Sequence, residues 1–479
     1  MRDAATDMSS IKFGTDGWRA VIADTFTFEN VTRVAQASAD YWAANPVSGT
    51  ERRVVIGYDR RFLSEKFAAI AAEVFAGNDY EVVLTPQPTP TPSVSFAVKQ
   101  LKAIGGVVIT ASHNPPHFNG FKLKSHYGGP AVPETCSAVE AFLERNPVRR
   151  VALDAAVKSR RVRIRDIKPA HYTALKRLVD FNLIKKSKLR FAHEALFGVG
   201  AGCFEELLKG TTCRVTTLNG QQDPYFGGIN PEPIKQNYRL SSGWLKKHPH
   251  DICLVTDGDA DRVGGMDGRG GYLSTHEIIA LLLGHYIRNR PEKGRVITAL
   301  TTTALIEKMC AAHGLQLEEV PVGFKHICSE MVKGGVMLGG EESGGIGFAG
   351  HIPERDGIAA GLMLLEMLAM ERVPVNKLVA KLYREFGPHH YDRKDIHFPL
   401  EKRPLLMSYL AANPPERLLK SPVTKVLTYD GVKFVAADSS WLMLRGSGTE
   451  PVLRIYAETS SQTGVQKLLR EGLQLTTRV

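Results

Sequence analysis

Ser112 stands where an apolar β-branched run ends in a turn. Residues 107–124 read VVITASHNPPHFNGFKLK, and we call residues 110–118 the serine loop. In an open α/β sheet, ligands bind at the carboxyl ends of strands, so a serine after this run can face a pocket. The two prolines fix φ and lack amide donors, which stiffens the loop. A serine hydroxyl needs a base, a metal or a cation to become a nucleophile, and Lys122 is the nearest candidate. An ordinary turn serine is the alternative.

Three aspartates alternate in DGDADR, residues 257–262, which we call the aspartate loop. Asp257, Asp259 and Asp261 converge after the apolar run DICLVT, and crowded carboxylates repel one another. A hard dication with oxygen ligands relieves this repulsion, which favours Mg²⁺. Arg262 follows, and it could neutralise the cluster or bind a phosphate. An acidic surface turn or part of a calcium loop is the alternative, although the distal glutamate of an EF-hand is not in its place.

Two further loops offer groups that bind sugar phosphates. In GGEESGG, residues 339–345, the carboxylate of Glu341 and the hydroxyl of Ser343 can bind adjacent sugar hydroxyls; we call it the sugar loop. In RGSGTEP, residues 445–451, an arginine, two hydroxyls and glycine amides suit a phosphate dianion; we call it the phosphate loop. Its candidate ligands are Arg445, Ser447, Gly448 and Thr449. The alternatives are a common glycine-rich turn and a tight hairpin turn.

Composition indicates a folded protein of several domains. With 479 residues, of which 43% are hydrophobic, the chain is too long for one core and suggests about three or four domains. The net charge of +11 is dispersed, except in the run KSRRVRIR at residues 158–165. No aromatic platform or groove-reading motif accompanies that run, so we expect a solvated linker face and no nucleic-acid partner. A mild basic excess equally suits small phosphorylated substrates.

The six cysteines are widely spaced and form no CxxC pair, which predicts reduced thiols in a cytoplasmic protein. The start, MRDAATDMSS, has no apolar core and no cleavage signature. The most apolar run, EIIALLLGHYI from Glu277, is too short to cross a bilayer. We therefore expect neither secretion nor a membrane partner.

Strand and helix patterns alternate along most of the chain. VVIGYD, YEVVLT and VVIT predict strands, and Thr27 predicts the N-cap of a first helix. SEKFAAIAAEVFAG predicts a capped amphipathic helix ending at Gly77, and PQPTPTPS a stiff connector. The alternation recurs twice. The second unit has a helix over HYTALKRLVDFNLI and strands at CRVTTL and DICLVT, and the third has strands at GRVITAL and GVMLGG with a helix at TALIEKMCAAHG between them. This is the pattern of parallel sheets.

The last part of the chain differs. VTKVLTY, VKFVAA, WLMLRG and VLRIYAE predict short strands before one helix, QTGVQKLLREGLQL. We predict an α/β protein of four domains around a central cleft. The first three are similar α/β domains that have mostly parallel sheets, and the fourth is a smaller C-terminal α+β domain. The predicted boundaries begin with a tail at residues 1–10. The serine loop lies in a domain at 11–150, the aspartate loop in a domain at 151–270, and the sugar loop in a domain at 271–388. The phosphate loop lies in the last domain, at 389–479.

In order and approximate spacing, the four loops resemble those of the α-D-phosphohexomutases, the phosphoglucomutase and phosphomannomutase superfamily. TASHNPPHFNGFK and DGDADR match closely, and the likeness extends from about Ile11 to the C-terminal helix. FGTDGWRA resembles the family's amino-terminal motif, which implies that Arg19 lies next to the active serine. VPVGFKH resembles a phosphoglucomutase segment with a lysine facing the substrate, which implies that role for Lys325. Gly345 departs from the family, because many relatives have histidine there, and this leaves substrate preference open.

The resemblance implies a phosphohexomutase in which Ser112 carries a phosphoryl group. Phosphoserine would convert a hexose monophosphate into hexose 1,6-bisphosphate, also the expected activator, and then take back the other phosphate. The three aspartates and Ser112 would hold Mg²⁺, and the phosphate loop would bind the phosphate that is not reacting. The sugar loop would recognise hydroxyls in two orientations. Lys122, Lys325 and His113 are acid/base candidates, and Lys122 is favoured because a nearby Arg19 would lower its pKa.

Several functions fit the sequence. Glucose 1-phosphate and glucose 6-phosphate are the leading substrate pair because of the GFK segment, with mannose phosphates next and a hexose bisphosphate synthase also open. The expected partners are small hexose phosphates, and the expected state is a monomer or homodimer. Outside the enzyme class, the alternatives are a non-catalytic sugar-phosphate binding protein and a basic nucleic-acid-binding protein, whose DNA affinity would fall steeply with salt.

Overall fold

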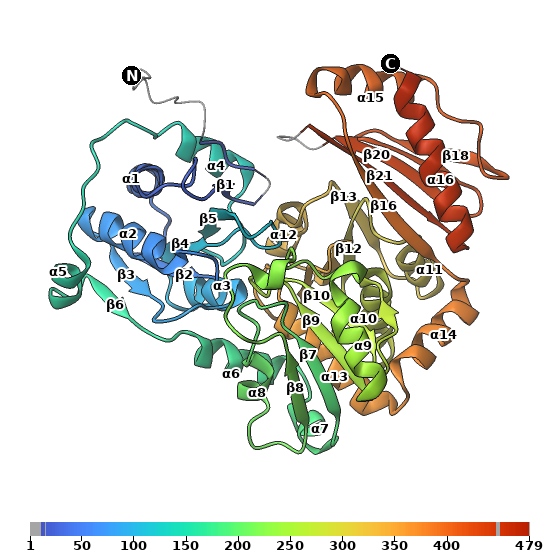
Figure 1. The fold of residues 1–479 in the computed structure, drawn as a ribbon, viewed down its shortest axis with the longest axis horizontal. Helices are drawn as coiled ribbons and strands as arrows, with labels where there is room; N and C mark the ends of the chain where they lie inside the picture. Colours follow the sequence, from blue (N-terminus) through green and yellow to red (C-terminus); the bar gives the residue numbers. More distant parts are fainter. Residues whose placement is uncertain (1–10, 15, 447–450, 479) are drawn as a thin grey trace. The chain divides into compact units, whose positions relative to one another are not determined.

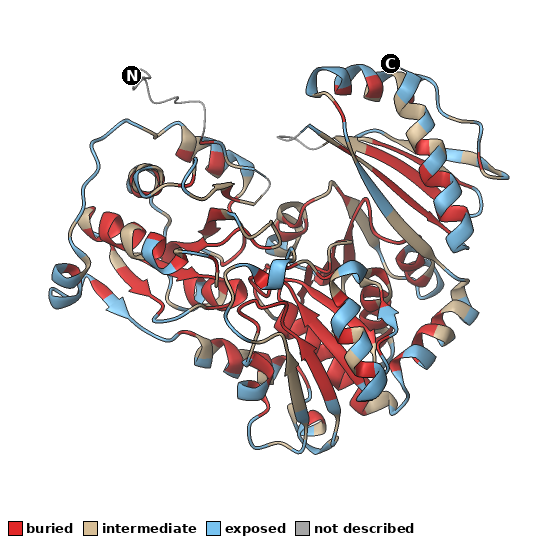
Figure 2. Ribbon diagram, in the orientation of Figure 1, coloured by how far each residue is buried: buried red, intermediate tan, exposed pale blue. Residues whose placement is uncertain are grey.

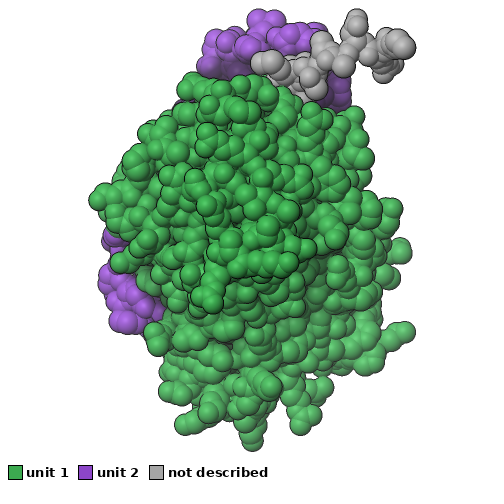
Figure 3. All heavy atoms as spheres, turned by 90° about the vertical axis from the view of Figure 1, so that its left-hand side faces the viewer, with its two compact units in different colours: residues 1–278, 328–334, 343–375 green, residues 279–327, 335–342, 376–479 purple. Residues whose placement is uncertain are grey.

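The structure is a computed structural model that describes residues 11–14, 16–446 and 451–478 (Figure 1). Its internal contacts divide the chain into two compact units, coloured separately in Figure 3. The first unit takes residues 1–278, 328–334 and 343–375, and the second takes 279–327, 335–342 and 376–479.

The first α/β domain is built on a six-stranded sheet of order β1-β5-β4-β2-β3-β6. Its strands are β1 (Trp18–Val21), β2 (Glu51–Tyr58), β3 (Glu81–Leu84), β4 (Ala103–Ile109), β5 (Phe118–Ser125) and β6 (Val162–Ile164). Strands β4, β2, β3 and β6 run parallel, whereas β5 is antiparallel to β4 and β1. The helices are α1 (Phe28–Ala44), α2 (Ser64–Gly77), α3 (Thr91–Gln100), α4 (Pro133–Glu140) and α5 (Leu153–Lys158).

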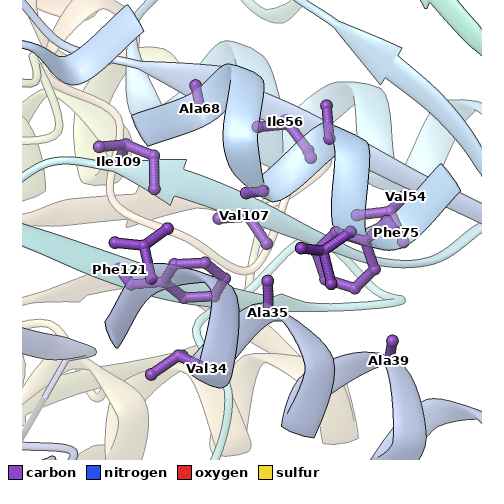
Figure 4. Packing of buried hydrophobic residues seen from close by; sticks show 14 of the residues in the cluster. Val34, Ala35, Ala39, Val54, Ile56, Ala68, Phe75, Val107, Ile109 and Phe121 are labelled. Atoms are coloured by element: carbon purple, nitrogen blue, oxygen red, sulfur yellow. The ribbon is translucent and has the colours of Figure 1, made fainter. Parts of the chain in front are cut away.

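Apolar side chains cover both faces of this sheet. Val107 of β4 belongs to a buried cluster with Ala35 of α1 and Phe75 of α2 (Figure 4). Its neighbour Val108 belongs to a second cluster with Val94 of α3. Because side chains alternate along a strand, helices on both faces leave β4 buried from end to end (Figure 2).

The second α/β domain has a five-stranded sheet of order β11-β10-β9-β7-β8. Its strands are β7 (Arg190–Glu194), β8 (Arg214–Leu218), β9 (Ile252–Thr256), β10 (Val263–Asp267) and β11 (Tyr272–Leu273). Strand β7 is parallel to β8 and β9, and β10 is antiparallel to β9 and β11. The helices are α6 (Lys168–Leu178), α7 (Phe181–Lys186), α8 (Cys203–Leu207) and α9 (Arg239–Lys247), with short 3₁₀ helices η2 (Phe226–Gly228) and η3 (Lys235–Tyr238).

The third α/β domain contributes to both compact units. Its strands are β12 (Arg295–Ala299), β13 (Leu317–Val320), β14 (Val336–Gly340) and β15 (Ile346–Phe348), and β12 is parallel to β13 and β14. Its helices are α10 (Thr275–Asn289), α11 (Ala304–Ala312), α12 (Phe324–Lys333), α13 (Gly357–Glu371) and α14 (Val375–Phe386). Strands β12 to β14 lie in the second unit, whereas β15 and α13 lie in the first.

The C-terminal domain has a six-stranded antiparallel sheet of order β16-β21-β20-β19-β18-β17. The strands are β16 (His390–His397), β17 (Arg417–Leu418), β18 (Ser421–Leu427), β19 (Val432–Ala436), β20 (Trp441–Gly446) and β21 (Val452–Thr459). The helices are α15 (Arg403–Ala412) and α16 (Gln462–Leu475), with 3₁₀ turns η4 (Leu400–Lys402) and η5 (Thr476–Arg478). Within the second unit, Trp441 and Tyr456 of this sheet pack with Leu300 and Ala304 of the third domain.

The predicted fold class, three α/β domains with mostly parallel sheets and a smaller α+β domain at the C-terminus, is confirmed. The predicted cap of α1 is confirmed too, because Thr27 Oγ1 accepts a hydrogen bond from the Asn30 amide at 3.2 Å. Within the described ranges, none of the helices combines the length and apolar character needed to cross a bilayer.

Local predictions were wrong at four places. Helix α2 ends at Gly77 as expected, but the predicted cap at its start is wrong: the N-cap residue is Leu63, which has no polar side chain, and Ser64 Oγ of the first turn donates to Asp59 Oδ1. The proline-rich connector gives way to α3 already at Thr91, since proline is tolerated in a first helical turn. The predicted helix over HYTALKRLVDFNLI is two helices, because the chain is extended at Val179 and Asp180 caps α7. The lysines and arginines of the basic run 158–165 are exposed as expected, but the run is not only a linker, because it contains β6, which extends the first sheet.

Candidate active site

Ser112 lies in the turn that follows β4, and its side chain is buried. Its φ of 53° is in the left-handed region, which is strained for a residue with a Cβ. Its Oγ donates a hydrogen bond to Asp257 Oδ2 at 2.9 Å and lies 3.4 Å from His113 Nδ1. The structure therefore brings the serine loop against the aspartate loop, both within the first unit.

The three aspartates of the aspartate loop follow β9 and are almost completely buried, with at most 1% of each exposed. One oxygen from each carboxylate lies within 4.8 Å of the others. Asp257, Asp259 and Asp261 are thus gathered as predicted from their alternation.

These carboxylates fit a divalent cation. Among the described residues, Asp259 Oδ1 and Asp261 Oδ1 have no hydrogen-bond donor, although both atoms are buried. Burial, and then the charges of Asp261 and Asp259, raise the pKa of Asp257 well above its ordinary value. Asp257 therefore resists ionisation beside the other two carboxylates, and a hard cation with oxygen ligands removes that conflict.

Lys122 on β5 is fully buried among carboxylates. Its Nζ lies 2.9 Å from Oδ2 of both Asp16 and Asp259 and 3.4 Å from Asp261 Oδ2. Burial acts to lower the pKa of Lys122, but Asp16, Asp259 and Asp261 raise it above its ordinary value. The expectation that Arg19 lowers this pKa is therefore wrong, because the carboxylates dominate the field at the ammonium group.

Arg19 on β1 contacts the serine loop through a neighbour of the serine. Its Nη1 donates a hydrogen bond to Asn114 Oδ1 at 2.6 Å, and its Nη2 lies 3.9 Å from Asp16 Oδ2. The residues FGTDGWRA thus supply both a cation and a carboxylate to the site.

Three residues at the aspartates were missed by the sequence interpretation. Arg355 Nη2 lies 2.7 Å from Asp16 Oδ2 and 2.8 Å from Asp261 Oδ2. Thr91 Oγ1 donates to Asp259 Oδ2 at 2.7 Å. Asp16 stands inside a motif that drew attention only to its arginine, Thr91 was hidden in the proline-rich connector, and Arg355 carries no local signal in the sequence.

The C-terminal end of the sugar loop is joined to the aspartate loop by backbone contacts. The Val263 amide donates to the Gly344 carbonyl at 2.9 Å, and Arg262 forms an isolated β-bridge with Gly345. Gly344 has a φ of 89°, and a Cβ there would lie 2.2 Å from Val263 O. Only glycine fits this approach. In the first unit, Ser343 and Arg262 therefore lie on adjoining loops.

The remaining predicted residues that the structure describes, Glu341, Lys325 and Arg445, belong to the second unit. Glu341 follows β14 and is buried, and Lys325 lies in the first turn of α12. Arg445, at the end of β20, donates from Nε to Asp430 Oδ1 at 2.9 Å. Burial acts against its charge, but Asp430 raises the pKa of Arg445 above its ordinary value. The other predicted phosphate ligands, Ser447, Gly448 and Thr449, lie outside the described residues.

A second group of possible metal ligands also occurs in the first unit. His171 Nε2 and His351 Nε2 each lie 2.8 Å from Asp356 Oδ2, while Ser93 Oγ lies 2.9 Å from His171 Nδ1. The other carboxylate oxygen, Asp356 Oδ1, caps α13. These side chains satisfy one another, so we interpret the group as a structural hydrogen-bond network joining α3, α6 and α13.

Family models for all four domains of one enzyme family match the chain in order. The models describe phosphoglucomutase/phosphomannomutase domains I, II and III, each alpha/beta/alpha, and the C-terminal domain. They match residues 10–149, 169–270, 275–386 and 409–472. The fold and the paired serine and aspartate loops thus define a phosphohexomutase. The chain belongs to the phosphoglucomutase/phosphomannomutase superfamily.

Individual relatives carry several substrate names. A putative phosphomannomutase from Thermus thermophilus has a solved structure with a TM-score of 0.86 and 34% sequence identity, covering 98% of this chain and 99% of that one. A phosphoglucomutase/phosphomannomutase of Thermococcus kodakarensis is 29% identical over 97% of this chain and 98% of its own. A phosphoglucosamine/phosphogalactosamine mutase of Sulfurisphaera tokodaii is 28% identical over 96% of this chain and 97% of its own.

Proposed function

We propose that this phosphohexomutase interconverts hexose 1-phosphate and hexose 6-phosphate through a phosphorylated Ser112, with glucose as the preferred hexose. The observation that carries the proposal is the 2.9 Å hydrogen bond from Ser112 Oγ to Asp257, one of three buried carboxylates. A hydroxyl held beside a potential cation site is positioned for phosphoryl transfer.

The proposed reaction has two half-reactions of the same kind. In the first, the free hydroxyl of a hexose monophosphate attacks the phosphorus of phosphorylated Ser112 and loses its proton, while the bond between phosphorus and Ser112 Oγ breaks and Oγ takes up a proton. In the second, the Ser112 hydroxyl loses its proton as Oγ attacks the other phosphate of the resulting hexose 1,6-bisphosphate, the bond between that phosphorus and the sugar oxygen breaks, and the freed sugar oxygen takes up a proton. The bisphosphate is thus both intermediate and activator.

We propose that Asp257, Asp259 and Asp261 hold Mg²⁺ together with an oxygen of phosphorylated Ser112. Bound there, the ion supplies charge neutralisation for phosphoryl transfer. The two oxygens without donors, Asp259 Oδ1 and Asp261 Oδ1, support this assignment.

The chain's own cations have separate proposed roles. The raised pKa keeps Lys122 protonated at neutral pH, which suits a charge partner of the transferring phosphoryl group rather than a base. His113 is the proposed proton acceptor, supported by its 3.4 Å distance from Ser112 Oγ. Arg19 would orient the serine loop through Asn114 and meet the incoming phosphate.

Substrate recognition is assigned to the remaining loops. We propose that Glu341 and Ser343 bind sugar hydroxyls, with Lys325 and Arg262 beside the substrate. Arg445, with Ser447, Gly448 and Thr449, would bind the phosphate that is not reacting, so that remote binding energy positions the other end. Glucose is supported by the segment VPVGFKH, whereas the relatives' names include glucose, mannose and amino sugars.

We also propose that the protein works in the cytoplasm. All six cysteines are free, and five of them are buried. Free thiols persist in a reducing compartment.

The test measures turnover of glucose, mannose, galactosamine and glucosamine 1-phosphates with Mg²⁺ and a trace of the matching bisphosphate. We expect the highest kcat/KM with glucose 1-phosphate. Ser112→Ala should lose about 10³-fold or more in kcat, since the nucleophile is removed. Ser95→Ala, at another fully buried serine of the first domain, should keep wild-type turnover.

Full turnover by Ser112→Ala would refute the phosphoserine assignment. A higher kcat/KM with another hexose would refute only the preference for glucose. Tight binding of hexose phosphates without any turnover would favour the non-catalytic alternative.

A further inference from the structure

A buried arginine outside the aspartate cluster binds the backbone of the serine loop. Arg61 follows β2, and only 2% of it is exposed. Its guanidinium donates hydrogen bonds to four carbonyl oxygens of this one loop. Through Nη2 it reaches those of Ser112 and Asn114 at 2.6 and 2.7 Å, and through Nη1 those of Pro115 and Phe118 at 2.8 and 3.0 Å.

Asp59 connects this arginine to the amide of the serine. Its Oδ2 accepts a hydrogen bond from Arg61 Nε at 3.1 Å and one from Thr110 Oγ1 at 2.6 Å. Thr110 Oγ1 in turn accepts a hydrogen bond from the Ser112 amide at 2.9 Å. The carbonyl and the amide of the serine are therefore both fixed by one buried ion pair.

The serine requires such support because of its backbone conformation. A φ of 53° at a residue with a Cβ persists only where the surroundings determine it. The backbone of the serine loop also packs closely against the aspartate loop, because a Cβ on Gly258 would lie 2.6 Å from Ser112 O. The Arg61 guanidinium is planar and rigid, so it can bond several carbonyls at once.

We propose that Arg61 is a positioning residue for phosphoryl transfer, acting with Asp59 to hold Ser112 Oγ toward the aspartate loop. The inference rests on the proposed function of Ser112. None of the hydrogen bonds of Arg61 described above goes to an aspartate of the cluster, so its effect passes through the backbone of the serine loop.

The test compares Arg61→Lys with Arg60→Lys. Lysine keeps the charge, but its three donors share one nitrogen and cannot span the four carbonyls. We expect Arg61→Lys to lower kcat by about 10²-fold, the size of effect that a displacement of about 1 Å produces. KM should stay within about threefold, and hydrogen exchange of peptides covering residues 110–118 should become faster. Arg60 donates to the Gly220 carbonyl at 2.8 Å rather than to the serine loop. Arg60→Lys should therefore change neither kcat nor the hydrogen exchange of residues 110–118.

Thr110→Val is the second variant and serves if Arg61→Lys does not fold. It removes only the hydroxyl between Asp59 and the Ser112 amide. We expect a lower kcat and faster hydrogen exchange of residues 110–118, both smaller in size than for Arg61→Lys. Unchanged kcat, or a lower kcat with unchanged exchange at residues 110–118, would overturn the inference. If the wild-type protein has no mutase activity, the proposed function fails, and the exchange comparison alone decides whether Arg61 holds the loop.

Discussion

At the scale of single residues, the site is a balance of buried charges. Lys122 and Arg355 lie among carboxylates that include Asp16, Asp259 and Asp261. Breaking one buried ion pair leaves an uncompensated charge, which typically costs about 3–5 kcal/mol. The cations Lys122 and Arg355 therefore hold the carboxylates together through these ion pairs.

His193 on β7 provides a prediction about acid stability. It is fully buried, with Nε2 3.0 Å from Thr256 Oγ1, and burial lowers its pKa from 6.5 to about 3. As the pH falls, the unfolded chain takes up a proton before the folded chain does. The contribution of this residue to stability is therefore present above pH 6.5 and is lost as the pH falls toward 3.

Between pH 7 and pH 5, this residue should remove about 2 kcal/mol from the free energy of unfolding. The His193→Asn variant lacks the titrating ring. Between pH 7 and pH 5, the free energy of unfolding of the variant should therefore fall by about 2 kcal/mol less than that of the wild type. Urea unfolding at both pH values measures the difference. Equal losses in the wild type and the variant would contradict the assignment.

Sequence alone revealed the composition of the site better than its electrostatics. The alternation of aspartates after β9 was sufficient to predict their convergence, because strand ends gather polar loops at one sheet edge. The surroundings of Lys122 were not predictable, since its partners come from residues 16 and 259–261, far away along the chain. A pKa depends on such distant charges, and a local pattern does not contain them.

At the scale of elements, loops after strands are held by contacts from other domains. The aspartate loop accepts hydrogen bonds from the Thr91 and Gly357 amides, at Asp259 O and Ala260 O. The sequence marked the strands before each loop, but it did not mark β5, which carries Lys122 in an antiparallel position. Its residues FNGFKLKS mix polar and apolar types, so their hydrophobic pattern is weak.

Gly344 gives a prediction at this scale. Gly344→Ala places a Cβ 2.2 Å from Val263 O at a φ of 89°, so the sugar loop must move away from the aspartate loop. Gly350→Ala is the matched control, because Gly350 has a φ of 75° but none of the described residues has an atom within 4 Å of its Cβ position.

Both variants should lose about 1 kcal/mol or more of stability from backbone strain. Only Gly344→Ala should also raise KM for the hexose phosphate, by about tenfold, the cost of losing about 1.4 kcal/mol of binding. Thermal unfolding and steady-state kinetics measure the two effects. Matching kinetics for both variants would show that the position of the sugar loop is unimportant for binding.

At the scale of the whole molecule, four domains form two compact units. The division runs through the sugar loop, with Glu341 in the second unit and Ser343 in the first. The order and type of the domains could be predicted because the first three repeat an alternation of strands and helices and the fourth departs from it. The division could not, since it depends on contacts between segments far apart in the chain.

The central claim is that Ser112 carries the phosphoryl group during turnover. Purified protein is incubated with Mg²⁺ and hexose 1,6-bisphosphate, and its phosphopeptides are identified by mass spectrometry before and after hexose monophosphate is added. We expect one phosphate per chain, located on Ser112 and discharged by the monophosphate. Sustained turnover with a phosphate on another residue, or with no phosphate on Ser112 at any stage, would contradict the account.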